Sequence, residues 1–201
     1  MAAARRIPAY ALRVIALIAS VAGIDALAGA PELKAGAFSP ARIAPDFSLT
    51  GSDGSALTLR RFRGKVVLLG FGYTSCPSVC PVTLATLAAA QRKLGAHARD
   101  VQVVYVTVDP VRDDAARMKG YLEAFHPDFL GATGTEEALE AVRREYGIAA
   151  KRLATPAGSY EYGHSSFVYL IDREGRLRAL MPYGRAAADY VHDAMLLLSP
   201  P

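Results

Sequence analysis

Cys76 and Cys80 are the only cysteines of the 201-residue chain, and a proline directly follows each of them. Two thiols at this spacing can form a redox disulfide, supply two ligands to a metal site, or be small buried apolar side chains. The thioredoxin-type redox motif has two residues between its cysteines, whereas this chain has three. The additional residue still permits a disulfide, whose Cα atoms need to lie about 4.4–6.8 Å apart, and it leaves room for a metal ion between the sulfurs.

The elements that must position these thiols alternate between strands and helices. Continuous apolar runs over 65–73 and 101–109 predict strands that are buried on both faces. The order of the elements predicts an α/β fold, a thioredoxin-like sandwich with a mixed central sheet, helices on both faces and an extra N-terminal β-hairpin. The other expected elements are the hairpin over 46–59, strands over 165–172 and 176–184, and helices over 82–95, 115–125, 135–147 and 186–198.

Cys76 and Cys80 fall between the first buried strand and the helix that follows it. This is the carboxyl end of a central strand, where α/β sheets hold their chemistry. Pro81 has no N–H and fits best at the first helical position, so we expect the helix to begin there after an irregular turn. Both sulfurs would then lie near the positive end of the helix dipole, which lowers a thiol pKa and favours the thiolate.

His164 is the histidine whose position suits a third ligand. We expect it to open the strand, which would then cover 164–172, after a loop over 154–163. In oxidoreductases of the thioredoxin fold, a proline at the start of the corresponding strand faces the redox cysteines. Matching residues 165–167 to that segment places His164 on the proline, so that its imidazole points at both thiols. The other histidines are expected to be surface or internally satisfied residues: His97, His126 and His192.

Three segments of the chain, in this order, resemble the Sco/SenC family: YTSCPSVCP, VTVDPVRDD and GHSSFVYLID. The resemblance covers the chain from roughly Ala44 to the last expected helix. It implies a thioredoxin-fold copper protein of bacterial or mitochondrial membranes. Members of the family are implicated in delivering copper to the binuclear site in subunit II of cytochrome c oxidase.

The resemblance also assigns individual residues. Cys76, Cys80 and His164 match the family's copper ligands, and Asp109 matches the aspartate of its DP motif. The chain departs from the family at two positions that often carry aspartate, because it has Ser78 and Gly163 there. These departures remove negative charge near the site and leave the three ligands intact.

Two thiolates and an imidazole form a soft, three-coordinate site that suits Cu(I), and such donors also hold Cu(II). Zinc is the competing metal, but it would need a fourth ligand or a bound water with a nearby general base. Asp109 either orients a ligand and directs negative charge toward the metal, or only organises the turn before Pro110. Tyrosines that either rim the site or serve in packing are Tyr73, Tyr160 and Tyr162.

The expected function is that of a copper-binding metallochaperone that assists copper-site assembly in cytochrome c oxidase. The alternative is a thiol-disulfide oxidoreductase, in which Cys76 and Cys80 reduce cysteines of exported proteins. The two functions are compatible, because the metal binds only when the cysteine pair is reduced. The expected partners are the copper-receiving subunit of the oxidase and a periplasmic thioredoxin-like reductant or another copper chaperone.

Residues 1–30 have the pattern of an export signal, with arginines before an apolar run over 14–24 and small residues after it. We expect a signal peptide cleaved after Ala28, with a membrane anchor as the alternative. The protein is therefore expected to be exported to the periplasm, either soluble or attached to the cytoplasmic membrane. Residues 31–44 are expected to be a linker, and residues 45–199 the copper-binding domain.

The composition supports one domain, because 52% hydrophobic residues can fill a core and two cysteines are too few for a disulfide framework. The formal net charge of +4 falls to +2 without residues 1–28, which carry three arginines and one aspartate. Basic residues do not cluster with aromatic ones. No nucleic-acid partner is therefore expected.

Overall fold

The computed structural model describes residues 32–156 and 158–199. The predicted signal peptide or membrane anchor over residues 1–30 lies outside these ranges. Among the helices that the structure describes, none is both long and apolar enough to cross a membrane.

The centre of the fold is an eight-stranded sheet with the strand order β1-β10-β9-β4-β5-β6-β2-β3. The pairs β4–β5 and β5–β6 are parallel, whereas β9 runs antiparallel to β4, so the sheet is mixed as predicted. All residues of β4 are apolar and buried, which suits a central strand covered on both faces. The strands are β1 (Gly36–Ile43), β2 (Ser48–Gly51), β3 (Ala56–Thr58), β4 (Val66–Gly72), β5 (Val101–Thr107), β6 (Leu130–Thr133), β9 (Val168–Ile171) and β10 (Arg176–Met181).

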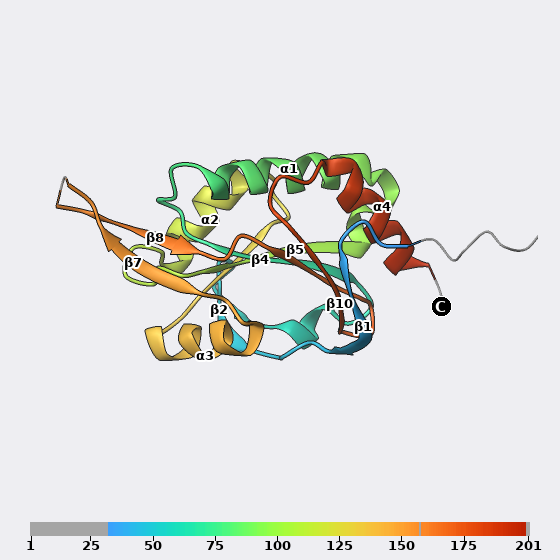
Figure 1. Cartoon of the computed structure of the whole chain (residues 1–201), viewed down its shortest axis with the longest axis horizontal. Helices are drawn as coiled ribbons and strands as arrows, with labels where there is room; N and C mark the ends of the chain where they lie inside the picture. Colours follow the sequence, from blue (N-terminus) through green and yellow to red (C-terminus); the bar gives the residue numbers. More distant parts are fainter. Residues whose placement is uncertain (1–31, 157, 200–201) are drawn as a thin grey trace, which may run out of the picture. The chain divides into compact units, whose positions relative to one another are not determined.

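Helices cover both faces of this sheet, with α1, α2 and α4 on one face and α3 on the other (Figure 1). They are α1 (Val79–Lys93), α2 (Ala115–Glu123), α3 (Glu136–Tyr146) and α4 (Ala187–Leu198), with short 3₁₀ helices at Leu59–Phe62 and Gly95–Asp100. The antiparallel pair β2–β3 is the predicted N-terminal hairpin, and it extends the sheet beyond β6. The thioredoxin-like α/β sandwich predicted from the sequence is confirmed.

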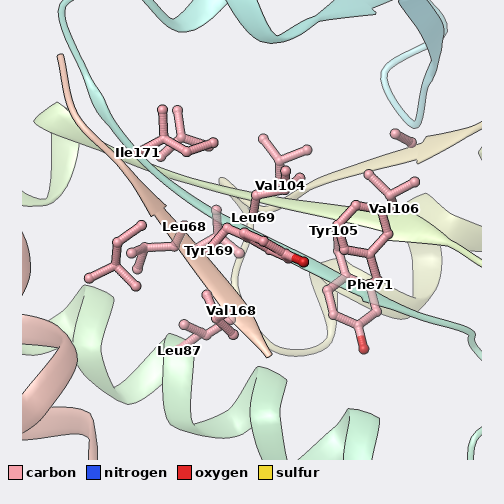
Figure 2. Packing of buried hydrophobic residues seen from close by; sticks show 14 of the residues in the cluster. Leu68, Leu69, Phe71, Leu87, Val104, Tyr105, Val106, Val168, Tyr169 and Ile171 are labelled. Atoms are coloured by element: carbon pink, nitrogen blue, oxygen red, sulfur yellow. The ribbon is translucent and has the colours of Figure 1, made fainter. Parts of the chain in front are cut away.

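The hydrophobic core lies between the sheet and its helices. Figure 2 shows Leu68, Val104 and Val168 from three adjacent strands, together with Leu87 from α1, in this core. Leu84 and Leu87 are both fully buried, and they hold α1 against the sheet. The packing of α1 therefore fixes the place where its first turn begins, which is the turn that carries the second cysteine.

Local signals in the sequence set the ends of α2 and α3. The Asp114 side chain accepts a hydrogen bond from the Arg117 N–H and caps α2. The Thr135 side chain does the same for α3 by accepting from the Ala138 N–H. Gly147 ends α3 with a φ of 67°, a left-handed conformation that favours glycine. These caps agree with the boundaries predicted from the sequence.

A separate two-stranded sheet stands beside the main one. It consists of β7 (Ala150–Ala154) and β8 (Tyr160–His164), which pair antiparallel. The predicted loop over 154–163 is therefore correct only for residues 155–159, which connect the two strands, and His164 ends a strand rather than opening one. Most residues of this hairpin are exposed or half-buried and lack a clear apolar alternation, so the sequence carried no strong strand signal.

Residues 36–43 form the edge strand β1, which pairs antiparallel with β10. Just before it, the N–H groups of Lys34 and Ala35 donate to the buried carboxylate of Asp193 at 2.7 and 2.9 Å. The predicted linker over 31–44 is therefore wrong for this segment, which packs against the domain. Its residues are almost all exposed, which fits an edge strand that pairs on one side only.

Candidate metal centre

Three side chains from separate segments meet beyond the carboxyl end of β4. Cys76 follows that strand in a loop, Cys80 lies in the first turn of α1, and His164 is the last residue of β8. The Cys80 sulfur lies 3.4 Å from His164 Nε2. All three potential ligand atoms lie within 4.8 Å of one another. The structure thus brings together the three residues that the sequence predicted as ligands.

The turn between the two cysteines is shorter than the sequence predicts. Helix α1 begins at Val79 with Ser78 as its N-cap, two residues before the predicted start at Pro81. Proline is tolerated there because N–H groups in the first turn have no partner within the helix. Cys80 therefore lies on the helix itself, and its N–H donates to the Cys76 sulfur at 3.5 Å.

The two thiols lie in opposite electrostatic environments. Cys80 is fully buried, and burial raises its pKa to about 12. Burial also acts to raise the pKa of Cys76, but hydrogen bonds from the backbone N–H groups of residues 78–80 outweigh it and hold that pKa below its ordinary value. The predicted preference for thiolate is therefore correct for Cys76 and wrong for Cys80 in the metal-free protein.

The imidazole of His164 presents one defined nitrogen to the thiols. Its Nδ1 lies 2.9 Å from the carbonyl oxygen of Ser165, which can only accept, so Nδ1 carries the proton. The lone pair of Nε2 then faces Cys80. Burial lowers the pKa of His164 below 6.5, although the hydrogen bond to Ser165 acts in the opposite direction. The imidazole is thus held neutral and ready to bind a metal.

Tyr73 supports this histidine. Its ring lies edge-on to the His164 ring, with 5.9 Å between the centroids. The Tyr73 hydroxyl accepts a hydrogen bond from the Tyr162 N–H at 3.2 Å. Tyr73 is only 1% exposed, so it forms the inner wall of the site and also fixes the neighbouring part of β8.

Asp109 lies outside the group of three possible ligands and instead anchors the hairpin. Its fully buried carboxylate accepts hydrogen bonds from Arg112 Nε and, at 2.9 Å, from the Tyr160 hydroxyl. Arg112 also donates to the Tyr160 carbonyl at 3.1 Å, and its guanidinium carbon lies 3.9 Å from the centre of the Tyr160 ring. Asp109 therefore acts on β8, which ends at His164.

Asp113 holds the loop that leads into Cys76. Its fully buried carboxylate accepts from the Thr74 N–H at 2.9 Å, the Thr74 hydroxyl at 2.6 Å and the Thr107 hydroxyl at 2.7 Å. Arg117 donates to the Thr74 hydroxyl from the exposed side. No local pattern could have revealed this role, because Thr74 is 39 residues away in the chain.

The other histidines do not join the site. His126 stacks on the ring of Phe129, and His192 pairs with Asp193 at 2.9 Å. His97 lies in the 3₁₀ helix after α1. Within residues 32–156 and 158–199, one group of histidine, cysteine and acidic side chains has metal-binding geometry, and it contains no carboxylate.

The donor set consists of two sulfurs and one imidazole nitrogen. These are soft or intermediate ligands, which favour Cu(I) and also hold Cu(II), whereas Mg²⁺ and Ca²⁺ prefer oxygen. Both cysteines are free thiols in the structure. Joining them in a disulfide would withdraw both sulfur donors, so the same residues can bind a metal or take part in thiol–disulfide exchange, but not both at once.

Comparisons with known proteins agree on one family. A model of the SCO1/SenC family matches residues 36–198. The SCO2-like protein of Rickettsia conorii is 35% identical over 137 residues, which make up 67% of this chain and 67% of that protein. The structure of Bradyrhizobium japonicum ScoI with copper bound has a TM-score of 0.72 and 35% identity, covering 77% of this chain and 99% of that one. Yeast Sco1 with copper bound has a TM-score of 0.69 and 29% identity, covering 77% and 87%.

Proposed function

Because this chain belongs to the SCO1/SenC family, we propose that it binds copper and serves in the assembly of cytochrome c oxidase as a copper metallochaperone. The observation that carries the proposal is the convergence of Cys76, Cys80 and His164, whose ligand atoms lie within 4.8 Å of one another. Two sulfurs and one nitrogen match the donor preference of Cu(I). The chain's relatives include structures with copper bound.

The different exposure of the two cysteines also suits the transfer of bound copper to another protein. Cys76 is half-buried, whereas Cys80 is fully buried. Thiolates of a recipient can therefore approach from the side of Cys76 and exchange ligands one at a time. The proposed recipient is the copper-receiving subunit of cytochrome c oxidase, and another copper chaperone is the proposed donor.

A second candidate function is thiol-disulfide exchange with exported proteins. The asymmetry of the two thiols favours it, because Cys76 is accessible with a lowered pKa and Cys80 is buried with a raised one. This is the arrangement of an attacking cysteine and a resolving cysteine. A thioredoxin-like reductant would then restore the thiols, and the reduced pair could again take up copper.

X-ray absorption on the reduced protein loaded with Cu(I) tests the copper site directly. The spectrum is expected to show two sulfurs and one nitrogen around each copper, and Cys76→Ser is expected to lose one sulfur. A spectrum dominated by oxygen ligands, or one that is unchanged in Cys76→Ser, would reject the proposed ligand set.

A comparison of two variants in cells separates the two functions. His164→Ala removes one of three copper ligands but leaves both thiols, whereas Cys76→Ser disables copper binding and exchange alike. If copper delivery is the main role, His164→Ala lowers cytochrome oxidase activity at limiting copper, and added copper restores part of it. If His164→Ala assembles the oxidase normally under these conditions while Cys76→Ser fails, the exchange function is the principal one.

We also propose that residues 1–30 export the protein, so that the domain works in the periplasm, soluble or attached to the cytoplasmic membrane. The support is the sequence pattern of basic, apolar and small residues. A fusion of residues 1–44 to alkaline phosphatase, which is active only after export, tests this location. Phosphatase activity in intact cells is expected, and an inactive, cytoplasmic fusion would reject it.

A further inference from the structure

Tyr105 carries a polar group into the core beside the proposed metal site. It lies in β5 between Val104 and Val106, and its side chain is almost entirely buried, with 2% of the residue exposed. Figure 2 shows its ring extending away from the strand, with the hydroxyl at the far end. A buried hydroxyl without a partner is destabilising, so the groups around it are informative.

Two glycines of β4 make room for this side chain. A Cβ atom on Gly70 would lie 2.9 Å from ring atoms of Tyr105. A Cβ atom on Gly72 would lie 2.0 Å from the Tyr105 hydroxyl and 2.7 Å from the Cys80 sulfur. The hydroxyl and the sulfur thus share the space over Gly72. Only glycine permits this approach.

We propose that Tyr105 is a positioning residue for the copper site, whose hydroxyl donates a hydrogen bond to the Cys80 sulfur. This hydrogen bond becomes stronger when the sulfur becomes a metal-bound thiolate. The consequence for copper rests on the proposed function, whereas the hydrogen bond itself does not. A thiol sulfur is a weak acceptor, and a thiolate is a much stronger one. The hydroxyl therefore stabilises the loaded state more than the metal-free state, and hydrogen bonding to a ligand sulfur also tunes the redox potential of copper.

Tyr105→Phe removes only the hydroxyl and keeps the ring that fills the space over the two glycines. The matched control is Tyr121→Phe in α2. The Tyr121 hydroxyl is also buried and lies close enough to Cys80 to feel its charge, yet it has no hydrogen-bond partner among the described residues. The control therefore removes the same atom from the same neighbourhood without breaking a hydrogen bond.

The first measurement uses metal-free, reduced protein in the Cys76→Ser background, where Cys80 is the only thiol. The infrared S–H stretching band of Cys80 is expected to shift in Tyr105→Phe and to stay in place in Tyr121→Phe. An unchanged band in Tyr105→Phe would overturn the proposed hydrogen bond, whether or not the protein binds copper.

The second measurement uses the otherwise native chain and a competing Cu(I) chelator. Tyr105→Phe is expected to lower the Cu(I) affinity by roughly tenfold, because it loses a hydrogen bond to a charged sulfur. The sulfur-to-Cu(II) charge-transfer band is expected to move to lower energy, since the sulfur then holds its electrons less tightly. Equal affinities and identical bands in both variants and the native protein would overturn the role in copper binding. Failure of the native protein to bind copper would instead reject the proposed function and leave the infrared result to decide the hydrogen bond.

Discussion

The carboxylate of Asp109 accepts a hydrogen bond from the hydroxyl of Tyr160 at 2.9 Å, across 51 positions of the chain. Asp109 follows β5, and Tyr160 begins β8, so this contact joins the main sheet to the hairpin that carries His164. Arg112 completes the contact by pairing with the same carboxylate and lying over the Tyr160 ring. The position of the imidazole therefore depends on residues that do not touch it.

Asp109→Asn is expected to weaken this connection. Asparagine has the same shape, but it leaves the half-buried Arg112 guanidinium without its anionic partner. We expect the free energy of unfolding to fall by about 2–3 kcal/mol and Cu(I) affinity to fall with it. Denaturant unfolding and chelator competition measure the two quantities.

Tyr160→Phe is the milder companion to that variant, because it removes one hydrogen bond and keeps the ring under Arg112. A loss of about 1 kcal/mol is expected. If Asp109→Asn proves no more harmful than Tyr160→Phe, the ion pair with Arg112 contributes nothing to the site.

Adjacent aspartates offer a test of the loop that precedes Cys76. Asp113→Asn disturbs three hydrogen bonds at a fully buried carboxylate and is expected to cost about 2–3 kcal/mol of stability. Asp114→Asn changes an exposed helix cap to a residue that caps about equally well, so its cost is expected to be small. Thermal unfolding of both variants checks the difference, and equal losses would contradict the assigned role of Asp113.

Alkylation of the reduced, metal-free protein is expected to distinguish the two thiols. The thiolate is the nucleophile, so at neutral pH Cys76, with its lowered pKa and partial exposure, reacts at least roughly tenfold faster than Cys80. The rate at Cys76 rises with pH, and the midpoint of this rise lies below the ordinary pKa of a thiol. Peptide mapping by mass spectrometry after iodoacetamide pulses measures both rates. Preferential labelling of Cys80 would contradict the assigned environments.

The titration of His164 is expected to have its midpoint below 6.5, because burial lowers its pKa in the folded state. Between the folded and unfolded pKa values the unfolded chain binds more protons, so stability falls as pH drops below about 6.5 and levels off below the folded pKa. NMR of the imidazole in reduced, metal-free protein gives the midpoint. In His164→Gln, the acid-side loss of stability is expected to be smaller, and an equal loss would assign it to other groups.

The parts of the structure that the sequence predicted are those with strong local signals. The apolar runs of β4 and β5 require burial on both faces, and Asp114, Thr135 and Gly147 mark helix ends with their own side chains or backbone. The three ligands were found through motifs that resemble a known family. Their convergence in space agrees with that prediction.

The features that the sequence did not reveal depend on contacts between distant segments. The hairpin β7–β8 and the edge strand β1 are largely exposed, so neither needs the apolar pattern that identifies a buried strand. The local sequence around Asp113 indicates only a residue before a helix, and the contact of its carboxylate with Thr74 appears only in the folded chain. The Tyr105 hydroxyl, in turn, comes close to the Cys80 sulfur only when β4, β5 and α1 are packed together.

Cys80 lies on a helix of the main domain and His164 on the separate β7–β8 hairpin, so the two ligands are expected to differ in the free energy needed to release them from their positions. Cys80 is in the cooperative core and becomes free only when α1 and the main sheet come apart. His164 belongs to a ladder of two strands, and the backbone pairs of that ladder can break while the core remains folded. In native-state hydrogen exchange, the amides of β8 should therefore exchange through local fluctuations and those of β4 through global unfolding. His164 can then dissociate from a bound metal ion while the domain that holds Cys76 and Cys80 stays folded.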